Sequence, residues 1–132
     1  MSSNPYKQYR ATKAQTASPV DLVVMLYQGV LRFTQRGIEG AERGDIKTAH
    51  ESFVRAQDVV AELLASLNME EGGEVAQNLV SVYDYAHRQL VLANTRKDPK
   101  PGREVIKIFR ELGSAWYQIA QTQRQDAAAA PA

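Results

Sequence analysis

The stretch DIKTAHESFVRAQDVVAELLASL, residues 45–67, constrains the fold of this chain more than any other part of the sequence. Its apolar residues recur in steps of three and four without interruption, at Ile46, Ala49, Phe53, Ala56, Val60, Leu63 and Leu67. This spacing places side chains on one face of an α-helix, and that face must be covered by other helices. The stretch therefore predicts an amphipathic helix over residues 45–69 inside a helical assembly.

Helix start and stop signals divide the rest of the chain into three more amphipathic segments. Ser18 and Pro19 begin the first segment, because serine caps a helix and proline fits its first turn, and Gly44 is suited to end it. The glycines at 72–73 and the prolines within 97–102 separate the later segments. Together these signals predict helices over residues 18–43, 45–69, 73–97 and 101–122.

Four amphipathic helices of similar length with short connections predict an all-α fold, an antiparallel up-down-up-down four-helix bundle. A helical hairpin pair that dimerises to complete the bundle is the alternative. We expect the bundle to occupy residues 18–122, between a flexible N-terminal arm over 1–17 and a disordered tail over 123–132. The alanines of that tail favour some helix.

Composition excludes several classes of function. The 132 residues include no cysteine, and 16 Lys and Arg against 15 Asp and Glu give a net charge of +1. Such a chain has no thiolate for metal binding or catalysis and no basic excess for nucleic acid. A di-iron bundle needs a Glu-x-x-His pair on each of two helices, whereas this chain offers only Asp84 to His87, so we expect no metal, no cofactor and no enzyme.

The same residues bear on location. The N-terminus has no basic stretch followed by an apolar run, and no apolar run approaches the roughly 20 residues that span a membrane. We therefore expect a cytoplasmic protein without membrane insertion.

The helices carry more apolar side chains than one core face requires, which predicts a partner groove. Helical-wheel positions place the surplus on the flanks of the core line, at Val20, Met25, Tyr27, Ile38, Val80, Tyr85, Leu92, Ile106 and Tyr117. A wide core face is the alternative explanation, above all for Tyr27 and Ile38. Exposed flanks on three helices would form grooves that accept an amphipathic segment.

The N-terminal arm carries Tyr6 and Tyr9 three residues apart in a polar segment. The arm is interpreted either as a disordered segment or as a lid that covers a groove until a partner displaces it.

Several blocks of the sequence resemble flagellar secretion chaperones of the FliS family, over roughly residues 4 to 120. The blocks are Asn4-Pro5-Tyr6-Lys7-Gln8-Tyr9, Ala17-Ser18-Pro19, Met25-Leu26-Tyr27-Gln28-Gly29, Ser66-Leu67-Asn68, Tyr83-Asp84-Tyr85 and Ala93-Asn94. Their order and spacing make the resemblance specific. The segment His87-Arg88-Gln89 departs from the family, where a second basic residue is expected.

The resemblance implies an antiparallel four-helix bundle and supplies a function that periodicity cannot. Family members bind the C-terminal segment of flagellin, prevent its premature polymerisation and deliver it to the flagellar type III export apparatus. The resemblance adds Arg88 and Asn94 to the candidate groove and implies that the arm with Tyr6 and Tyr9 occupies part of it in the empty state. A helical adaptor or regulatory protein that self-associates, or binds another amphipathic partner, is the alternative, and we expect a monomer or weak homodimer.

Overall fold

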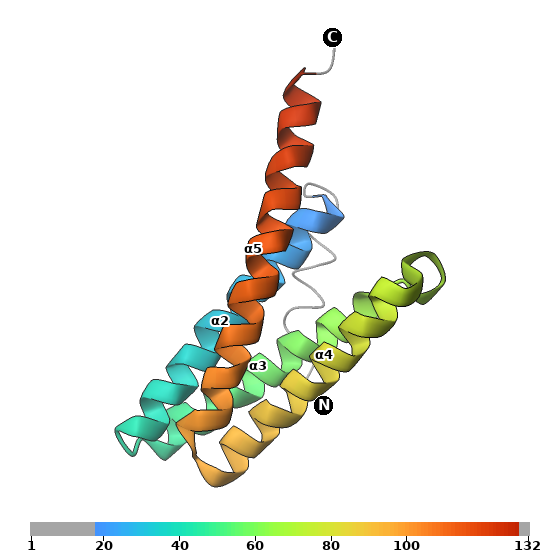
Figure 1. The fold of residues 1–132 in the computed structure, drawn as a ribbon. Helices are drawn as coiled ribbons and strands as arrows, with labels where there is room; N and C mark the ends of the chain where they lie inside the picture. Colours follow the sequence, from blue (N-terminus) through green and yellow to red (C-terminus); the bar gives the residue numbers. More distant parts are fainter. Residues whose placement is uncertain (1–17, 130–132) are drawn as a thin grey trace, which may run out of the picture.

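The computed structural model describes residues 18–129, which form four helices: α2 (Pro19–Glu42), α3 (Ile46–Ser66), α4 (Met69–Arg96) and α5 (Pro99–Ala129). Successive helices run in opposite directions, and α2, α3, α4 and α5 follow one another around a shared core (Figure 1). The predicted all-α, antiparallel four-helix bundle is confirmed. The predicted N-terminal arm, with Tyr6 and Tyr9, lies outside the described residues.

Side-chain caps begin the first three helices. The Ser18 hydroxyl accepts a hydrogen bond from the Asp21 backbone N–H at 3.1 Å, and Asp45 accepts one from Thr48 N–H at 3.1 Å. Bonds from the Thr48 hydroxyl and N–H hold the pKa of the Asp45 carboxyl below its ordinary value. Asn68 accepts from the Glu71 N–H at 3.0 Å. Each cap satisfies a backbone donor that the helix itself cannot, which fixes where the helix starts.

Small residues bring the helices together at the end that holds the α2–α3 and α4–α5 turns, which we call the closed end. A Cβ at Gly37 would lie 2.7 Å from the ring of Phe53, and a Cβ at Gly40 would lie 2.8 Å from the backbone nitrogen of Ala49. The glycines of α2 therefore let α3 approach closer than any other residue type would allow.

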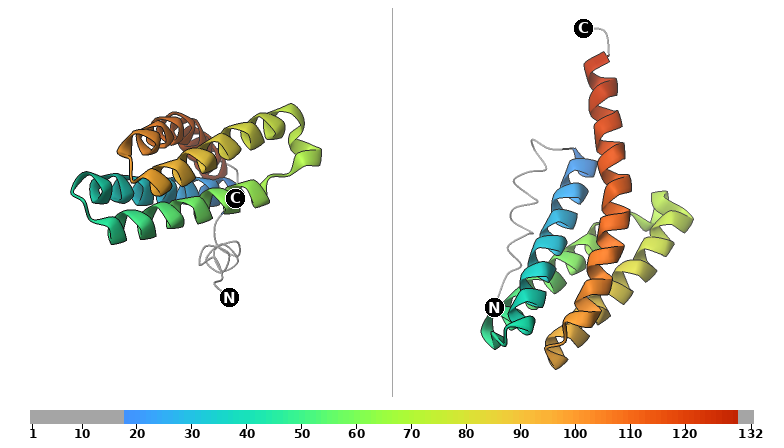
Figure 2. Two further views of the ribbon diagram at one scale, coloured as in Figure 1. Left: turned by 90° about the horizontal axis from the view of Figure 1, so that it is seen from below. Right: turned by 60° about the vertical axis from the view of Figure 1, so that its left-hand side comes forward.

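Aromatic rings fill the core in the middle of the bundle. The rings of Tyr27 and Phe109 lie with centroids 4.8 Å apart, and those of Tyr83 and Phe109 lie 5.9 Å apart. Beyond these rings α4 and α5 diverge, and the C-terminal part of α5 extends past the other helices (Figures 1 and 2). We call this end, where α3 connects to α4, the open end.

The observed helix bounds correct four of the predicted ones. Helix α3 ends at Ser66, three residues before the predicted end. Helix α4 begins at Met69, four residues early, and contains a non-helical residue at Gly73, where φ is +52°. Helix α5 begins at Pro99, since the first turn of a helix tolerates proline. It continues to Ala129, so the predicted disordered tail is wrong for residues 123–129, where alanine favours the helix and Arg124 pairs with Asp21 at 3.2 Å.

The close α2–α3 contact predicts opposite outcomes for two glycine substitutions in helices. Gly40→Ala should lower the free energy of unfolding by about 1–3 kcal/mol, because its Cβ meets backbone that cannot move aside. Gly113→Ala is the control and should keep or raise the free energy of unfolding. Its Cβ would lie 3.4 Å from Tyr27, an ordinary contact, and alanine favours the helix. Urea unfolding measures both, and equal stability of the two variants would contradict the account of the closed end.

Candidate functional site

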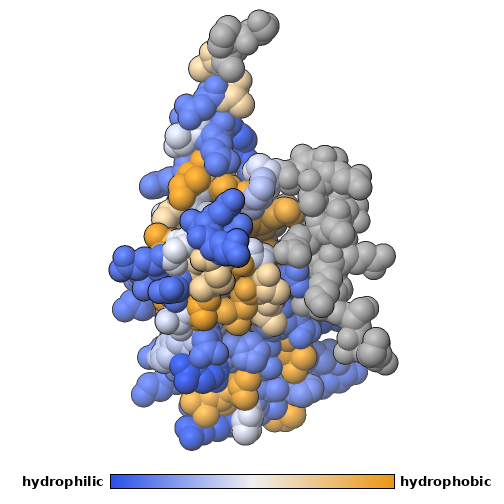
Figure 3. Space-filling model, turned by 90° about the vertical axis from the view of Figure 1, so that its right-hand side faces the viewer, coloured by the Kyte–Doolittle hydropathy of each residue, from blue (hydrophilic) through white to orange (hydrophobic). Residues whose placement is uncertain are grey.

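An apolar cleft lies at the open end and is lined by all four helices. Its volume is about 320 Å³. The lining residues are Val23, Leu63, Ser66, Leu67, Asn68, Glu71, Gly72, Val75, Ala76, Leu79, Tyr83 and Trp116. We refer to it as the open-end cleft. Hydrophobic residues interrupt the hydrophilic surface on the face of the molecule shown in Figure 3.

The cleft forms because core-face residues continue to the helix ends while the helices separate. Leu67 follows the last residue of α3 and continues its core spacing, and Val75 and Leu79 lie at the core spacing of α4, yet Val75 is 66% exposed. Ile119 on α5 belongs to the same kind of stripe and is 44% exposed. Apolar residues that one helix directs toward the next are therefore left without cover at this end.

A second groove, of about 390 Å³, lies between α4 and α5 and is lined by Ser81, Val82, Tyr85, Ile108, Glu111 and Leu112. At its edge the Tyr85 hydroxyl donates to Glu104 at 2.6 Å, and the Gln89 amide donates to the same carboxylate at 2.9 Å. These bonds hold the pKa of Glu104 below its ordinary value, and the bond to Glu104 raises the pKa of Tyr85. The half-exposed Tyr85 ring is thereby fixed across the two helices.

A buried hydrogen-bonded group closes the base of the open-end cleft. The hydroxyls of Tyr27 and Tyr83 lie 2.5 Å apart, and the indole N–H of Trp116 donates to the Tyr27 oxygen at 3.2 Å. Burial raises the pKa of both phenols, so they remain neutral hydroxyls. Because these bonds connect α2, α4 and α5, they fix the position at which the helices separate.

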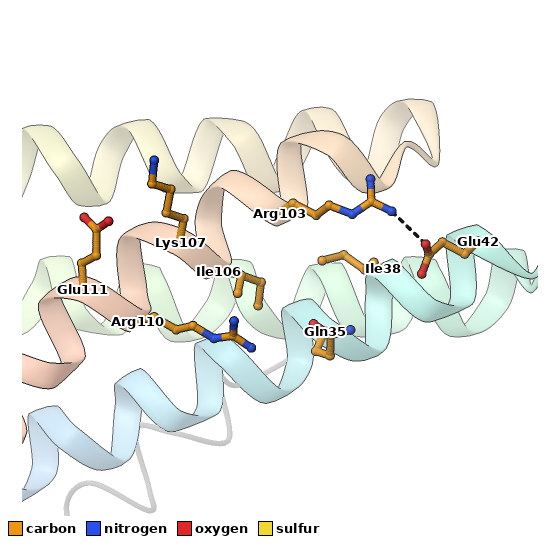
Figure 4. Close-up of a pocket in the computed structure, with 8 residues that line it drawn as sticks. All are labelled: Gln35, Ile38, Glu42, Arg103, Ile106, Lys107, Arg110 and Glu111. Carbon is orange, nitrogen blue, oxygen red and sulfur yellow. Dashed lines mark hydrogen bonds and ion pairs between the residues drawn. The ribbon is translucent and has the colours of Figure 1, made fainter.

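Three candidate groove residues lie in the core instead of on an exposed flank. Tyr27 is 1% exposed, Ile38 3% and Ile106 8%, so the expectation of an exposed flank is wrong for them and the wide core face applies. Neighbouring helices cover them because α2 packs closely against both α3 and α5. Ile38 and Ile106 lie at the base of a separate groove between α2 and α5 (Figure 4).

The other candidates are spread over the surface. Val20, Met25, Val80 and Leu92 are half-buried, Tyr117 is 48% exposed, and Arg88 forms an exposed ion pair with Asp84 at 3.5 Å. Asn94 hydrogen-bonds His50 on α3 and accepts from the Lys97 ammonium, which gives it a structural role near the closed end. Among the candidates within residues 18–129, Tyr85 lines the groove between α4 and α5, and none lines the open-end cleft itself.

The residues that line the open-end cleft were not predicted as a site. The apolar ones at core spacing, such as Leu63, Val75 and Leu79, continue the stripes that predict a core, so the spacing alone does not distinguish them from covered residues. The sequence holds one local signal, the glycines at 72–73, where a helix-breaking pair interrupts a stripe that continues on both sides.

Comparison with known proteins identifies the family. The family model described as "Flagellar protein FliS" matches residues 2–123. The chain is 33% identical to the flagellar secretion chaperone FliS of Bacillus subtilis, over 93% of this chain and 91% of the relative. It is 36% identical to the chaperone of the same name from Vibrio cholerae, over 82% of this chain and 79% of that one.

The chain belongs to the FliS family. A third relative, the flagellar secretion chaperone FliS of Salmonella typhimurium, is 36% identical over 80% of this chain and 78% of the relative. Since the match to the family begins at residue 2 and ends at residue 123, it includes every residue that lines the open-end cleft.

Within residues 18–129, no group of His, Asp or Glu side chains is arranged to hold a metal ion. None of the four described helices combines the length and the apolar character that a membrane span requires.

The two buried tyrosine hydroxyls predict a non-additive effect of two substitutions on stability. Tyr27→Phe should cost about 1–3 kcal/mol, because it leaves the buried Tyr83 hydroxyl and the Trp116 indole N–H without their partner. Adding Tyr83→Phe removes the unsatisfied Tyr83 hydroxyl, so the double variant should lose less than the sum of the single losses. Urea unfolding of all four proteins completes the cycle, and additive losses would show that the two hydroxyls do not interact.

Proposed function

We propose that this protein is a flagellar secretion chaperone that binds the C-terminal segment of flagellin in the open-end cleft. Membership of the FliS family supports the role, and the uncovered apolar cleft is the observation that supports the place. An amphipathic helix inserted between α4 and α5 would cover apolar residues of both. Burying a large apolar side chain contributes about 1.5–3 kcal/mol, so a few anchors give useful affinity.

Binding of this kind prevents polymerisation without any catalytic residue. The flagellin segment must be apolar on one face to pack within a filament, and a chaperone that covers this face removes it from self-association. Ordering a disordered segment on binding costs free energy, which keeps the complex reversible. Release can then occur at the flagellar type III export apparatus, to which the chaperone delivers flagellin from the cytosol.

The second candidate function is a helical adaptor that uses the same cleft to self-associate. The exposure of Val75, Met69 and Ile119 favours it as much as it favours a flagellin site, since a second copy would cover them equally well. Light scattering after size exclusion separates the two, because the chaperone forms a 1:1 complex with a flagellin C-terminal peptide at micromolar concentration and the adaptor forms a stable dimer alone.

Two valines on α4 test the cleft directly. Val75→Glu should weaken binding of the flagellin C-terminal peptide at least about tenfold, or about 1.4 kcal/mol, because a carboxylate would have to be buried against the peptide. Val91→Glu makes the same change on the same helix at a residue that is 41% exposed and outside the cleft. The affinity of this control variant for the peptide should stay within about twofold of that of the unmodified protein.

Isothermal titration calorimetry measures both affinities, with thermal melting as a check that each variant folds. Equal affinities for the two variants would place the peptide elsewhere. If the unmodified protein did not bind the flagellin C-terminal peptide, the proposed function itself would be contradicted.

Eight exposed or half-buried candidates remain proposed contacts along the path of the client outside the cleft. They are Val20, Met25, Val80, Tyr85, Arg88, Leu92, Asn94 and Tyr117. The arm with Tyr6 and Tyr9 is proposed as the lid of the empty state. If it is a lid, deletion of residues 1–15 should leave peptide affinity unchanged or raise it, and a severe loss in the same calorimetric assay would show that the arm contacts the client directly.

A further inference from the structure

Charged residues divide by sign along the second half of the chain. Residues 56–86 hold six carboxylates and no Lys or Arg, at Asp58, Glu62, Glu70, Glu71, Glu74 and Asp84. Residues 88–110 hold seven cations, at Arg88, Arg96, Lys97, Lys100, Arg103, Lys107 and Arg110, against two carboxylates, at Asp98 and Glu104. The basic segment covers the α4–α5 turn and the N-terminal part of α5, so these cations lie on the α5 side of the closed end (Figure 1), where the neighbouring α2–α3 turn adds charges of both signs.

A groove between α2 and α5 lies within this basic region. Its volume is about 650 Å³, and its lining includes three cations of α5, Arg103, Lys107 and Arg110. Figure 4 shows Arg110 directed toward α2 beside Gln35, while Lys107 and Glu111 extend from α5 on the side away from α2. The buried side chains of Ile38 and Ile106 form an apolar base.

Two of these cations are not neutralised within residues 18–129. Arg103 pairs with Glu42 at 2.8 Å, whereas neither Lys107 nor Arg110 has a carboxylate within ion-pair distance in that part of the chain. The nearby carboxylate of Glu104 accepts hydrogen bonds from Tyr85 and Gln89 on the α4 side, and Lys107 acts on it through its charge without an ion pair. The groove, whose lining also includes Glu111, therefore presents two cations that form no ion pair in the described part of the chain.

We propose that the α2–α5 groove docks an acidic segment of a second protein. Carboxylates of that segment pair with Arg110 and Lys107, and an aliphatic side chain covers the apolar base formed by Ile38 and Ile106. Guanidinium groups suit this role because they bind carboxylates in a fixed planar geometry and are enriched at protein interfaces.

The docking site lies toward the closed end, whereas the open-end cleft lies at the other end of the bundle. The two can be occupied together, and the proposal does not depend on what fills the cleft. A docked acidic partner would hold the chaperone while its client stays bound.

A labelled peptide of Glu residues with Leu at helical spacing is the probe, and fluorescence anisotropy measures its affinity for the full chain. The affinity should fall about tenfold between about 50 mM and about 300 mM NaCl, because the contacts are exposed charges. The same peptide with Lys in place of Glu should not bind. A labelled DNA duplex that bound as tightly as the acidic peptide would overturn the assignment to a protein partner.

Two double variants with the same charge change locate the contact. The double variant Lys107→Glu with Arg110→Glu should lower the affinity for the acidic peptide at least about tenfold. The control is the double variant Lys47→Glu with Arg55→Glu, on α3 across the bundle from α5. It should change the affinity for the acidic peptide less than about threefold. Equal losses would mean a diffuse charge effect and would overturn the site.

Nuclear magnetic resonance of the unmodified protein gives a second measurement that does not rely on variants. Amide shifts on peptide addition should concentrate in residues 35–42 and 103–111, and shifts confined to other segments would overturn the proposal. Concentration-dependent dimerisation that buries these same residues would replace the foreign partner by a second copy and would also overturn it.

Discussion

The contact among the rings of Tyr27, Tyr83 and Phe109 sets the shape of the whole bundle. The three rings come from α2, α4 and α5, and together they fill the middle of the core. Hydrogen bonds between the two tyrosine hydroxyls, and from Trp116 to Tyr27, satisfy the polar ends of this group inside the protein. A buried hydroxyl without a partner would cost about 1–3 kcal/mol, so the rings hold one arrangement.

The two ends of the bundle differ because residues on either side of this aromatic group differ in size. Toward the closed end, Gly37 and Gly40 let α3 approach the backbone of α2. Toward the open end no comparable glycine contact joins α4 to α5 within the described residues, and the helices diverge beyond the rings. Core-spaced residues such as Val75 and Leu79 then line a cleft instead of a core. The open-end cleft is thus a consequence of packing, and its apolar lining follows from the same periodicity that forms the helices.

Most of the fold could be predicted from the sequence, because local signals determine it. The seam of residues 45–67, the caps at Ser18 and Asp45, and the glycine and proline breaks predict four helices and their antiparallel order. The end of α5 was misjudged because its stabilising contact, between Arg124 and Asp21, joins residues far apart in the sequence. The candidate site was harder to predict from the sequence for the same reason. A helical wheel shows which face is apolar, but the separation of two helices decides whether Val75 is covered and whether Tyr27 is exposed.

The emission of Trp116 during titration with a tryptophan-free flagellin C-terminal peptide tests the central claim most directly. Trp116 is the only tryptophan of the chain, and it lines the open-end cleft. If the client segment fills this cleft, emission should shift to shorter wavelength and saturate at one peptide per chain, because the indole loses its contact with water. If a 1:1 complex forms while the emission of Trp116 stays unchanged, the client lies elsewhere on the bundle and the account of the cleft is contradicted.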